Sequence, residues 1–207
     1  MNFNKKKEID LFLNGIPPSF KKNFLNKKIF AVDGAYSYLK KYKIPIDYLS
    51  GDFDSFLYKK ENILVKKSIF NTYNQKKTDF EKALTIIIEK GFNNVNVWGA
   101  SGKEQDHFLG NLSTALKYKK EISIIFYDYY HSYFFLEKKS KLFVKKNKKI
   151  SLFPFPSVLK LKTKGLKYNI NNTDMEIGKN IGIRNKSVEN YIEILYKKGE
   201  LLIFIEN

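Results

Sequence analysis

Short apolar runs that end in turn residues recur through the first 127 residues of the chain. Four of them have the length of a strand and stop at Asp or Gly, namely Phe30–Val32, Tyr48–Ser50, Asn96–Trp98 and Ile122–Tyr127. A short apolar run bounded by turn residues is typical of a strand buried in a sheet. The pattern therefore predicts four buried strands, each followed by a turn.

Segments with helical periodicity lie between these runs. Asp79–Lys90 carries apolar residues three and four positions apart, begins after Thr78 and stops at Gly91. Gln105–Tyr118 has a similar apolar face, and Ala35–Lys41 is a shorter segment of the same kind. Strands that alternate with helices indicate a parallel sheet with helices on its faces.

The pattern changes after Asp128, where no segment has a convincing helical period. Strand-like runs separated by turn residues follow one another there: His131–Leu136, Lys141–Val144, Ile150–Phe153, Val158–Thr163, Tyr191–Leu195 and Leu201–Ile205. Many short strands of this kind are typical of a small sandwich or barrel. We therefore expect an α/β domain with a mostly parallel sheet over residues 1–128, followed by an all-β C-terminal sandwich over residues 129–207.

The positive charge of the chain suggests a nucleic-acid partner, but the near absence of arginine argues against one. The formal net charge is +17, which by itself indicates a nucleic-acid-binding protein. Arg184 is the only arginine, although Arg is the favoured side chain for guanine readout and for bidentate phosphate contacts. We therefore attribute the charge to a lysine-rich composition and expect no nucleic-acid partner.

The composition also indicates in which cellular compartment the protein is expected. The chain has no cysteine, which excludes disulfides and thiolate metal sites and fits a reducing compartment. The N-terminal segment lacks the apolar core and cleavage site of a signal peptide, and no apolar stretch approaches the roughly 20 residues of a membrane-spanning helix. We expect a cytoplasmic protein without a membrane partner.

Two carboxylates follow directly after the second predicted strand. Asp52 and Asp54 lie two positions apart in the segment Gly51–Ser55, so in an extended chain both side chains can face the same way. Two carboxylates this close repel each other unless a cation neutralises them, and Mg²⁺ prefers oxygen ligands of this type. The alternative interpretation is a polar turn that binds no ligand.

Polar residues also follow the other predicted strands. The glycines and Lys103 of segment Gly99–His107 precede a helix, an arrangement that suits a phosphate group. Asp79 lies at another helix N-terminus, where a carboxylate is favoured even without a ligand. Asp33 and Gly34 end a further strand. Open α/β sheets bind ligands at the carboxyl ends of their strands, so we expect these segments to converge in one site.

The ordered set of motifs resembles the thiamine pyrophosphokinase family over nearly the whole chain. The resemblance is carried by Asp33–Ala35, Gly51–Ser55, Thr78–Leu84, Gly99–Leu112, Gly165–Tyr168 and Gly182–Asn185. It implies a transferase that moves the diphosphate group of Mg-ATP to the hydroxyl of thiamine, which gives thiamine diphosphate and AMP. It also implies a homodimer whose N-terminal domain binds ATP and whose C-terminal sandwich binds thiamine.

The resemblance assigns roles to individual residues. Mg²⁺ would be held by Asp52, Asp54, Gln75 and Asp79. The nucleotide would be bordered by Asp33, Gly34, Asp52, Ser55, Thr78, Gly102, Lys103 and His107. Catalytic roles would fall to Asp54, Asp79 and Asp106, and either Asp106 or Asp54 would accept the proton of the thiamine hydroxyl. Thiamine would contact Tyr168, Arg184 and Asn185, with the Tyr168 ring offered to the positive thiazolium.

Two positions depart from the family pattern. Lys103 replaces a residue that is usually Arg or Gly, which keeps a charge but loses the bidentate fork of an arginine. Arg184 stands where the family usually has Ser, beside a substrate that is itself a cation. A related Mg²⁺-dependent diphosphotransferase or kinase acting on another alcohol is therefore one alternative function. A basic nucleic-acid-binding protein is the other.

Overall fold

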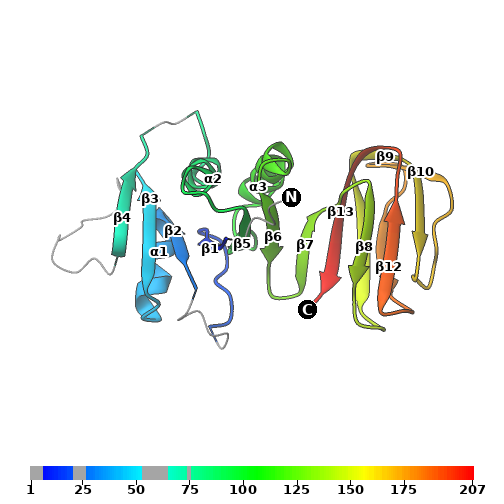
Figure 1. The fold of residues 1–207 in the computed structure, drawn as a ribbon, viewed down its shortest axis with the longest axis horizontal. Helices are drawn as coiled ribbons and strands as arrows, with labels where there is room; N and C mark the ends of the chain where they lie inside the picture. The colour runs from blue at the N-terminus through cyan, green and yellow to red at the C-terminus, as the bar shows by residue number, and fades with distance from the viewer. Residues whose placement is uncertain (1–6, 21–26, 53–64, 74–75) are drawn as a thin grey trace, which may run out of the picture. The chain divides into compact units, whose positions relative to one another are not determined.

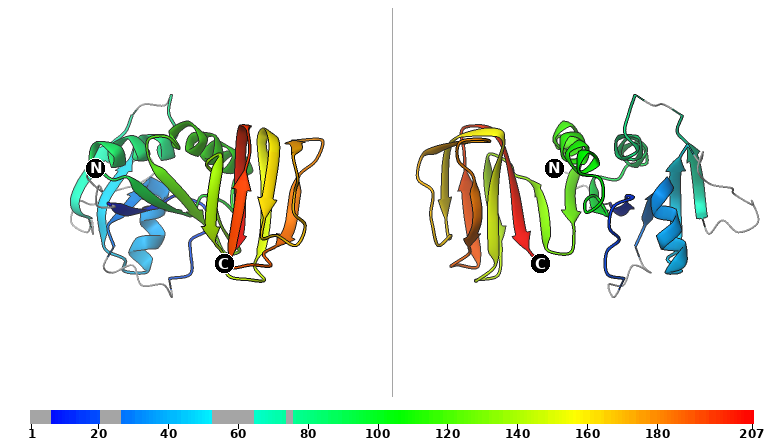
Figure 2. Two further views of the ribbon diagram at one scale, coloured as in Figure 1. Left: turned by 45° about the vertical axis from the view of Figure 1, so that its right-hand side comes forward. Right: turned by 180° about the vertical axis from the view of Figure 1, so that it is seen from behind.

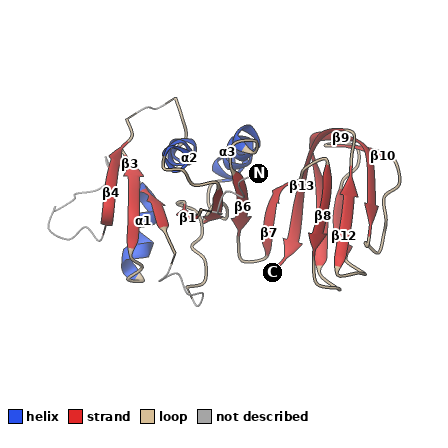
Figure 3. Ribbon diagram, viewed as in Figure 1, coloured by secondary structure: helices blue, strands red, loops and turns tan. Residues whose placement is uncertain are grey.

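The structure is a computed structural model that describes residues 7–20, 27–52, 65–73 and 76–207. The chain divides into two compact units, which comprise residues 1–129 and 130–207. Figure 1 shows strands and helices in the first unit, and Figure 3 shows that the second unit consists of strands and loops. The sequence-based expectation of an α/β part followed by a β part agrees with this order of elements.

Among the described residues of unit 1, six strands form a parallel sheet in the order β4-β3-β2-β1-β5-β6. Their bounds are β1 (Glu8–Phe12), β2 (Ile29–Val32), β3 (Ile46–Gly51), β4 (Val65–Asn71), β5 (Asn94–Trp98) and β6 (Ser123–Tyr127). The chain runs outward from β1 to β4 on one side, and then continues from β5 on the other side of β1. The ends of β1 and β5 therefore flank the topological switch point, where open α/β sheets bind ligands.

Helices cover both faces of this sheet (Figures 1 and 2): α1 (Asp33–Lys41) lies on one face, and α2 (Asp79–Glu89) and α3 (Gln105–Tyr118) lie on the other. The apolar face predicted for α2 is buried, and its Phe80 ring packs edge-on against Phe126 of β6, with 5.8 Å between centroids. Burial of such a face stabilises a helix more than its intrinsic propensity does.

Aromatic rings line the face of the sheet on which α1 lies. Phe12 at the end of β1 stacks between Phe20 and Trp98, at centroid distances of 6.4 and 6.3 Å. Trp98 at the end of β5 also stacks on Tyr127 of β6, at 4.7 Å. Phe20 continues the packing to Tyr42 beyond α1, at 4.4 Å. This row of rings fixes the strand ends from which the loops of the switch point emerge.

Unit 2 contains seven strands within residues 130–207: β7 (His131–Phe135), β8 (Lys139–Phe143), β9 (Lys149–Lys164), β10 (Thr173–Glu176), β11 (Gly182–Lys186), β12 (Tyr191–Leu195) and β13 (Lys198–Glu206). All of their pairings are antiparallel. The long strand β9 organises the unit, because β10, β11, β12 and β13 all pair with it. Side chains from β9, β12 and β13 enclose one apolar core that includes Ile150, Leu152, Ile192, Ile194, Leu201 and Ile203.

Several sequence-based expectations need correction. The runs Ile150–Phe153 and Val158–Thr163 were expected to be separate strands, but they are parts of the single strand β9. The prolines between them read as a break, although the strand continues through them. Strands β1, β4, β10 and β11 were not predicted. Two of these, β4 and β11, carry polar and exposed positions, so their sequences lack the apolar signal of a buried strand.

In the part of the chain that the structure describes, no helix is long and apolar enough to cross a membrane.

Candidate active site

Two loops meet at the switch point of the unit 1 sheet. The Gly15 N–H donates a hydrogen bond to the Gly99 carbonyl at 2.7 Å, and the Ile16 N–H donates to the Ser101 carbonyl at 2.9 Å. A Cβ atom at position 15 would overlap with both carbonyl oxygens, so only glycine permits this approach. The segment that follows β1 is therefore joined by its backbone to the segment that follows β5.

A buried tyrosine fixes the first of these loops. The Tyr38 hydroxyl, on α1, donates a hydrogen bond to the Leu13 carbonyl at 2.7 Å and packs against Gly99. Burial raises the pKa of Tyr38 above its usual value, so the phenol stays protonated and remains a donor. Helix α1 thereby holds the loop after β1 in place.

The loop between β5 and α3 has the features predicted for a phosphate-binding segment. Gly102 has a φ of +89° and is exposed, and Lys103 is exposed beside it. The Asn111 side chain, on α3, donates to the Ala100 carbonyl at 2.9 Å and so ties the loop to the helix. Helix α3 begins at Gln105, and its first backbone N–H groups favour an anion.

Asp106 and His107 lie in the first turn of α3, and both are exposed. Asp106 Oδ1 accepts a hydrogen bond from the His107 backbone N–H at 2.8 Å. His107 Nε2 lies 3.8 Å from a carboxylate oxygen of Glu104, and both side chains are about three-quarters exposed. Solvent screens such a pair, so it holds His107 weakly and leaves the imidazole available to a ligand.

The predicted residues of α2 begin that helix. Thr78 is the N-cap, and its Oγ1 accepts a hydrogen bond from the Glu81 N–H at 3.2 Å. Asp79 is the first helical residue, and its Oδ1 lies 3.1 Å from Lys82 Nζ. The Lys82 side chain is only 10% exposed and also donates to the Thr72 carbonyl at 3.0 Å. Lys82 thus fixes the Asp79 carboxylate to the segment that follows β4.

Hydrogen bonds connect this pair to the end of β3. The Thr72 N–H donates to the Gly51 carbonyl at 2.9 Å, and Asp52 follows Gly51 directly. Asp52 and Asp79 therefore belong to the same edge of the sheet. Their carboxylate oxygens are the ligand type that Mg²⁺ prefers, so the chemistry of these two residues fits that ion.

The remaining predicted metal and phosphate residues are Asp54, Ser55, Gln75, Asp33 and Gly34. Asp54, Ser55 and Gln75 lie outside the described residues. Within the described ranges, no group of three Asp, Glu, His or Cys residues is placed to hold a metal ion. Asp33 begins α1 directly after β2, and Gly34 follows it.

The C-terminal signatures come together within unit 2. The Tyr168 N–H donates to Asn185 Oδ1 at 3.1 Å, and Asn185 Nδ2 donates to the Tyr168 carbonyl at 2.7 Å. Asn185 Oδ1 also accepts from the Lys186 N–H at 2.8 Å. The amide of Asn185 is therefore engaged with the backbone, whereas Tyr168 is 65% exposed and its ring carries the Lys167 ammonium at 5.2 Å from the ring centre.

Arg184 lies in a β-bulge. The pairing of β11 with β9 shifts register between Gly182 and Asn185, and Arg184 has a φ of +56°. Its backbone N–H donates to the Ser151 hydroxyl at 3.0 Å. A bulge re-aims the side chain that it carries and often lies beside a functional site. Arg184 thus occupies a special backbone conformation.

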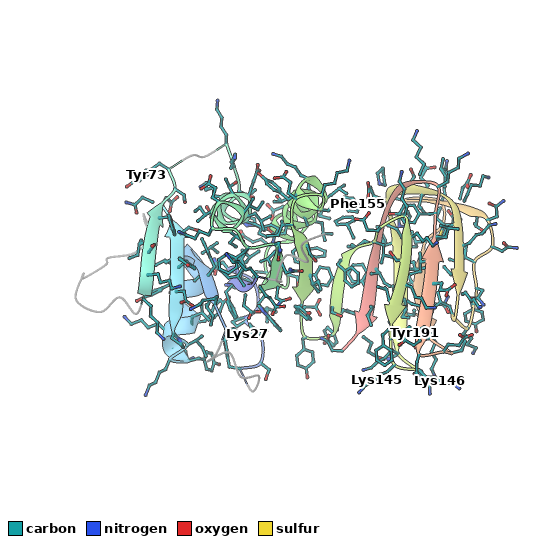
Figure 4. The ribbon with its side chains drawn as sticks, viewed as in Figure 1. Lys27, Tyr73, Lys145, Lys146, Phe155 and Tyr191 are labelled. Atoms are coloured by element: carbon teal, nitrogen blue, oxygen red, sulfur yellow. The ribbon has the colours of Figure 1, made fainter. Side chains whose placement is uncertain are left out.

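A buried carboxylate in β1 was not predicted from the sequence. Asp10 is 1% exposed, and its Oδ1 accepts a hydrogen bond from the Trp98 indole N–H at 2.8 Å. Its Oδ2 lies 3.3 Å from Nζ of Lys27, which Figure 4 labels, but without the alignment of a hydrogen bond. Burial raises the pKa of Asp10, and the contacts with Trp98 and Lys27 oppose that effect. Asp10 orients the residue that precedes the Gly99 loop.

Other residues of the site also escaped the sequence analysis. Asn14 and Gly15 occupy the switch point, yet the apolar run before them was not assigned to a strand. The signal was the Asn-Gly pair directly after that run, which has the form of the other strand ends. Lys82 and Tyr38 have no sequence signal, because their roles depend on contacts with distant backbone carbonyls.

Comparison with known proteins identifies the family. The family model described as "Thiamin pyrophosphokinase, catalytic domain" matches residues 22–126, and the one described as "Thiamin pyrophosphokinase, vitamin B1 binding domain" matches residues 136–201. The chain belongs to the thiamin pyrophosphokinase family. A curated relative named "Thiamine pyrophosphokinase" from Bacillus subtilis (strain 168) is 29% identical over 167 residues, which are 77% of this chain and 78% of the relative.

Solved structures of similar proteins share the fold. The structure of thiamine pyrophosphokinase from Bacillus subtilis superposes with a TM-score of 0.82 at 22% identity, over 97% of this chain and 99% of that one. Thiamin pyrophosphokinase from Candida albicans gives a TM-score of 0.80 at 18% identity, over 97% and 89% of the two chains. The arrangement of elements in this thiamin pyrophosphokinase family member is therefore that of bacterial and fungal structures alike.

Proposed function

We propose that this chain transfers the diphosphate group of Mg-ATP to the hydroxyl of thiamine, giving thiamine diphosphate and AMP. The observation that carries the proposal is the pair of family matches, in order, to a catalytic domain and a vitamin B1 binding domain. They correspond in the chain to unit 1 and unit 2. The assignment of ATP to the first unit and thiamine to the second is part of the proposal.

The switch point of unit 1 is the proposed site for the ATP phosphates. The N-terminus of α3 supplies backbone N–H groups, and Lys103 supplies a positive charge beside Gly102. Asp33 and Gly34 at the start of α1, together with Thr78 and His107, border the same edge of the sheet in this proposal. The backbone hydrogen bonds between the loops after β1 and β5 support this proposal, because they hold the two loops together at the switch point.

Asp52 and Asp79 are proposed as Mg²⁺ ligands, and Asp54 and Gln75 complete the predicted set. Bound there, the ion would neutralise charge on the phosphate oxygens during transfer. Lys82 orients the Asp79 carboxylate from a nearly buried position, so Asp79 is held toward the edge where Asp52 emerges. Asp52 and Ser55, which both lie in the segment Gly51–Ser55, are also proposed to contact the nucleotide.

The transfer itself requires one proton acceptor. The thiamine hydroxyl attacks the β-phosphorus, its proton passes to a carboxylate, and the bond to the oxygen shared with the α-phosphorus breaks, releasing AMP. Asp106 and Asp54 are the two candidates for the acceptor. Positioning of the reactants contributes more to such a reaction than covalent help from the protein.

Unit 2 is the proposed binding site for thiamine. Tyr168 is exposed, and its ring would accept the positive thiazolium in place of the Lys167 ammonium, which lies 5.2 Å from the ring centre. Asn185 acts in this proposal by holding the backbone of Tyr168 rather than by contacting the substrate directly. Arg184 is proposed to face the diphosphate, because a second cation beside the thiazolium would weaken its binding.

The test is incubation of the purified protein with Mg-ATP and thiamine, followed by separation of the nucleotides and thiamine compounds. The proposal predicts AMP and thiamine diphosphate in equal amounts. The position of Arg184 favours one second candidate, a diphosphotransferase or kinase that acts on another alcohol. Consumption of ATP with another alcohol and none with thiamine would establish that alternative.

The proposal also includes the assembly and compartment of the enzyme. We propose a homodimer in the cytoplasm, as the family resemblance implies. Light scattering coupled to size-exclusion chromatography measures the mass in solution, for which a value near twice the 24.4 kDa chain is expected. A monomer that retains full activity would contradict this part of the proposal.

A further inference from the structure

Asn14 occupies the point of unit 1 where three strand ends meet. It follows β1 and lies directly before Gly15, whose N–H joins the loop after β5. Its side chain also packs against the start of α1, because a Cβ atom at position 34 would overlap with the Asn14 amide. Glycine at position 34 is thus required to make room for Asn14.

The third contact of Asn14 is with the proposed phosphate-binding loop. Lys103 Nζ donates a hydrogen bond to Asn14 Oδ1 at 3.0 Å. Both residues are exposed, so the bond lies at the surface of the site, where a ligand can reach the ammonium group. The segments that follow β1, β2 and β5 therefore converge on a single side chain.

A fixed hydrogen-bond acceptor such as Asn14 can orient the flexible Lys103 side chain. A lysine ammonium is a point charge on a flexible four-carbon stem, and it lacks the rigid fork with which an arginine orients itself on phosphate. An acceptor that is itself fixed can restrict the stem to conformations that direct the charge toward the N-terminus of α3. Asn14 is fixed by the backbone bond of its neighbour Gly15 and by its packing on Gly34.

We propose that Asn14 is a positioning residue that holds the Lys103 ammonium in place to bind the phosphate groups of ATP. The inference rests on the proposed function only in naming ATP as the anion. Asn14 acts through Lys103, so its removal weakens binding of the nucleotide and leaves the binding of thiamine unchanged. The effect of losing Asn14 also disappears once Lys103 itself has been removed.

The experiment is a double-mutant cycle read out by ATP binding. Calorimetric titration with a non-hydrolysable ATP analogue and magnesium gives the dissociation constant of the wild type, Asn14→Leu, Lys103→Met and the double variant. Asn14→Leu keeps the shape of the side chain and removes the acceptor. We expect each single variant to weaken binding by about 5- to 20-fold, and the double variant to be within about 2-fold of Lys103→Met, because coupled residues are not additive.

Asn93→Ala is the matched control. Asn93 also accepts a backbone hydrogen bond, from the Lys7 N–H at 3.1 Å, but it precedes β5 at the opposite edge of the same sheet. Its removal is expected to leave ATP binding unchanged. Asn14→Ala serves as a second variant, and thermal unfolding verifies that each protein is folded.

Two results would overturn the inference: unchanged ATP affinity in Asn14→Leu and Asn14→Ala, or multiplication of the two single effects in the double variant. A wild-type protein that binds ATP but does not convert thiamine would contradict the proposed function instead. The binding cycle would still decide the role of Asn14, so the two failures are distinguishable.

Discussion

The side chain of Asn185 holds the backbone of Tyr168 on both its N–H and its carbonyl group. Asn185 Oδ1 accepts from the Tyr168 N–H at 3.1 Å, and Asn185 Nδ2 donates to the Tyr168 carbonyl at 2.7 Å. The pair joins the loop after β9 to strand β11, two segments that are 17 residues apart in the sequence. The exposed ring of Tyr168 therefore projects from a fixed backbone.

Replacing Asn185 with alanine tests the importance of this clamp for stability. The substitution removes both bonds to Tyr168 and the bond from the Lys186 N–H. At about 0.5–1.5 kcal/mol for each of these three hydrogen bonds, we expect the free energy of unfolding to fall by about 1.5–4.5 kcal/mol, measured by urea denaturation. Asn171→Ala, at an exposed position of the same unit, is the control and should change it by less than about 0.5 kcal/mol. Equal effects of the two substitutions would contradict a clamp.

The parts of the fold that sequence reasoning predicted are those with strong periodicity or clear boundaries. The helix over Gln105–Tyr118 and the strand at Tyr191–Leu195 match their predicted bounds, because apolar spacing and turn residues define both. Strand β1 is central to the sheet, yet it went unpredicted because Asp10 interrupts its apolar run. That carboxylate contacts Trp98 and Lys27, which are distant from it in the sequence.

In the candidate site too, residues with a local sequence signal were predicted, whereas residues that depend on distant contacts were not. Lys103 was found because it follows a strand end, and Thr78 because it begins a helix, and both are local properties of the sequence. Asn14 and Lys82 gain their roles from contacts with segments that the sequence does not place beside them. The roles assigned to the site residues stay predictions until variants at those positions are measured.

Arg184→Gly tests the backbone conformation of the bulge. A φ of +56° costs a non-glycine residue about 1 kcal/mol, and glycine adopts it without steric cost. We expect the substitution to leave the free energy of unfolding unchanged or to raise it by up to about 1 kcal/mol. Arg184→Val, a β-branched residue in the same conformation, is expected to lower it. The reverse order of stability would show that the bulge has another conformation.

The contribution of Asp10 to the free energy of unfolding is expected to fall as the pH rises. Burial raises its pKa in the folded protein, so the ionised carboxylate opposes folding at pH values above its ordinary pKa of 3.8. Asp10→Asn removes that charge and retains an oxygen that can accept from the Trp98 indole. We expect the melting temperature of the variant relative to the wild type to increase as the pH is raised from 4 to 7.

Asp174→Asn is the comparison variant, because the pKa of Asp174 is lowered in the folded protein whereas that of Asp10 is raised. The Lys160 N–H donates to Asp174 Oδ1 at 2.8 Å, and this bond lowers the pKa of Asp174. The wild type therefore gains stability from Asp174 above its ordinary pKa and loses it as the pH falls. The melting temperature of this variant relative to the wild type should decrease as the pH is raised from about 2 to about 4, and should change little from there to pH 7. pH profiles that change in the same direction for the two variants would contradict one of the two assignments.

Asp79→Asn separates a metal-binding role from a helix-capping role. Loss of a carboxylate at a helix N-terminus costs about 0.3–1 kcal/mol of stability, which is too little to unfold the protein. Loss of a Mg²⁺ ligand should instead raise the magnesium concentration needed for half-maximal activity by at least about 10-fold. Glu89→Gln, at the other end of α2, is the control and should leave magnesium dependence unchanged. Normal magnesium dependence in Asp79→Asn would assign Asp79 to the helix alone.

The most direct test of the central claim follows the phosphorus atoms of ATP. The protein is incubated with magnesium, thiamine and ATP that carries a radioactive label at the β-phosphorus only. Diphosphate transfer predicts that the label appears in the thiamine product and that the nucleotide product is unlabelled AMP. Label that remains in the nucleotide as ADP, with an unlabelled thiamine product, would contradict the proposed reaction.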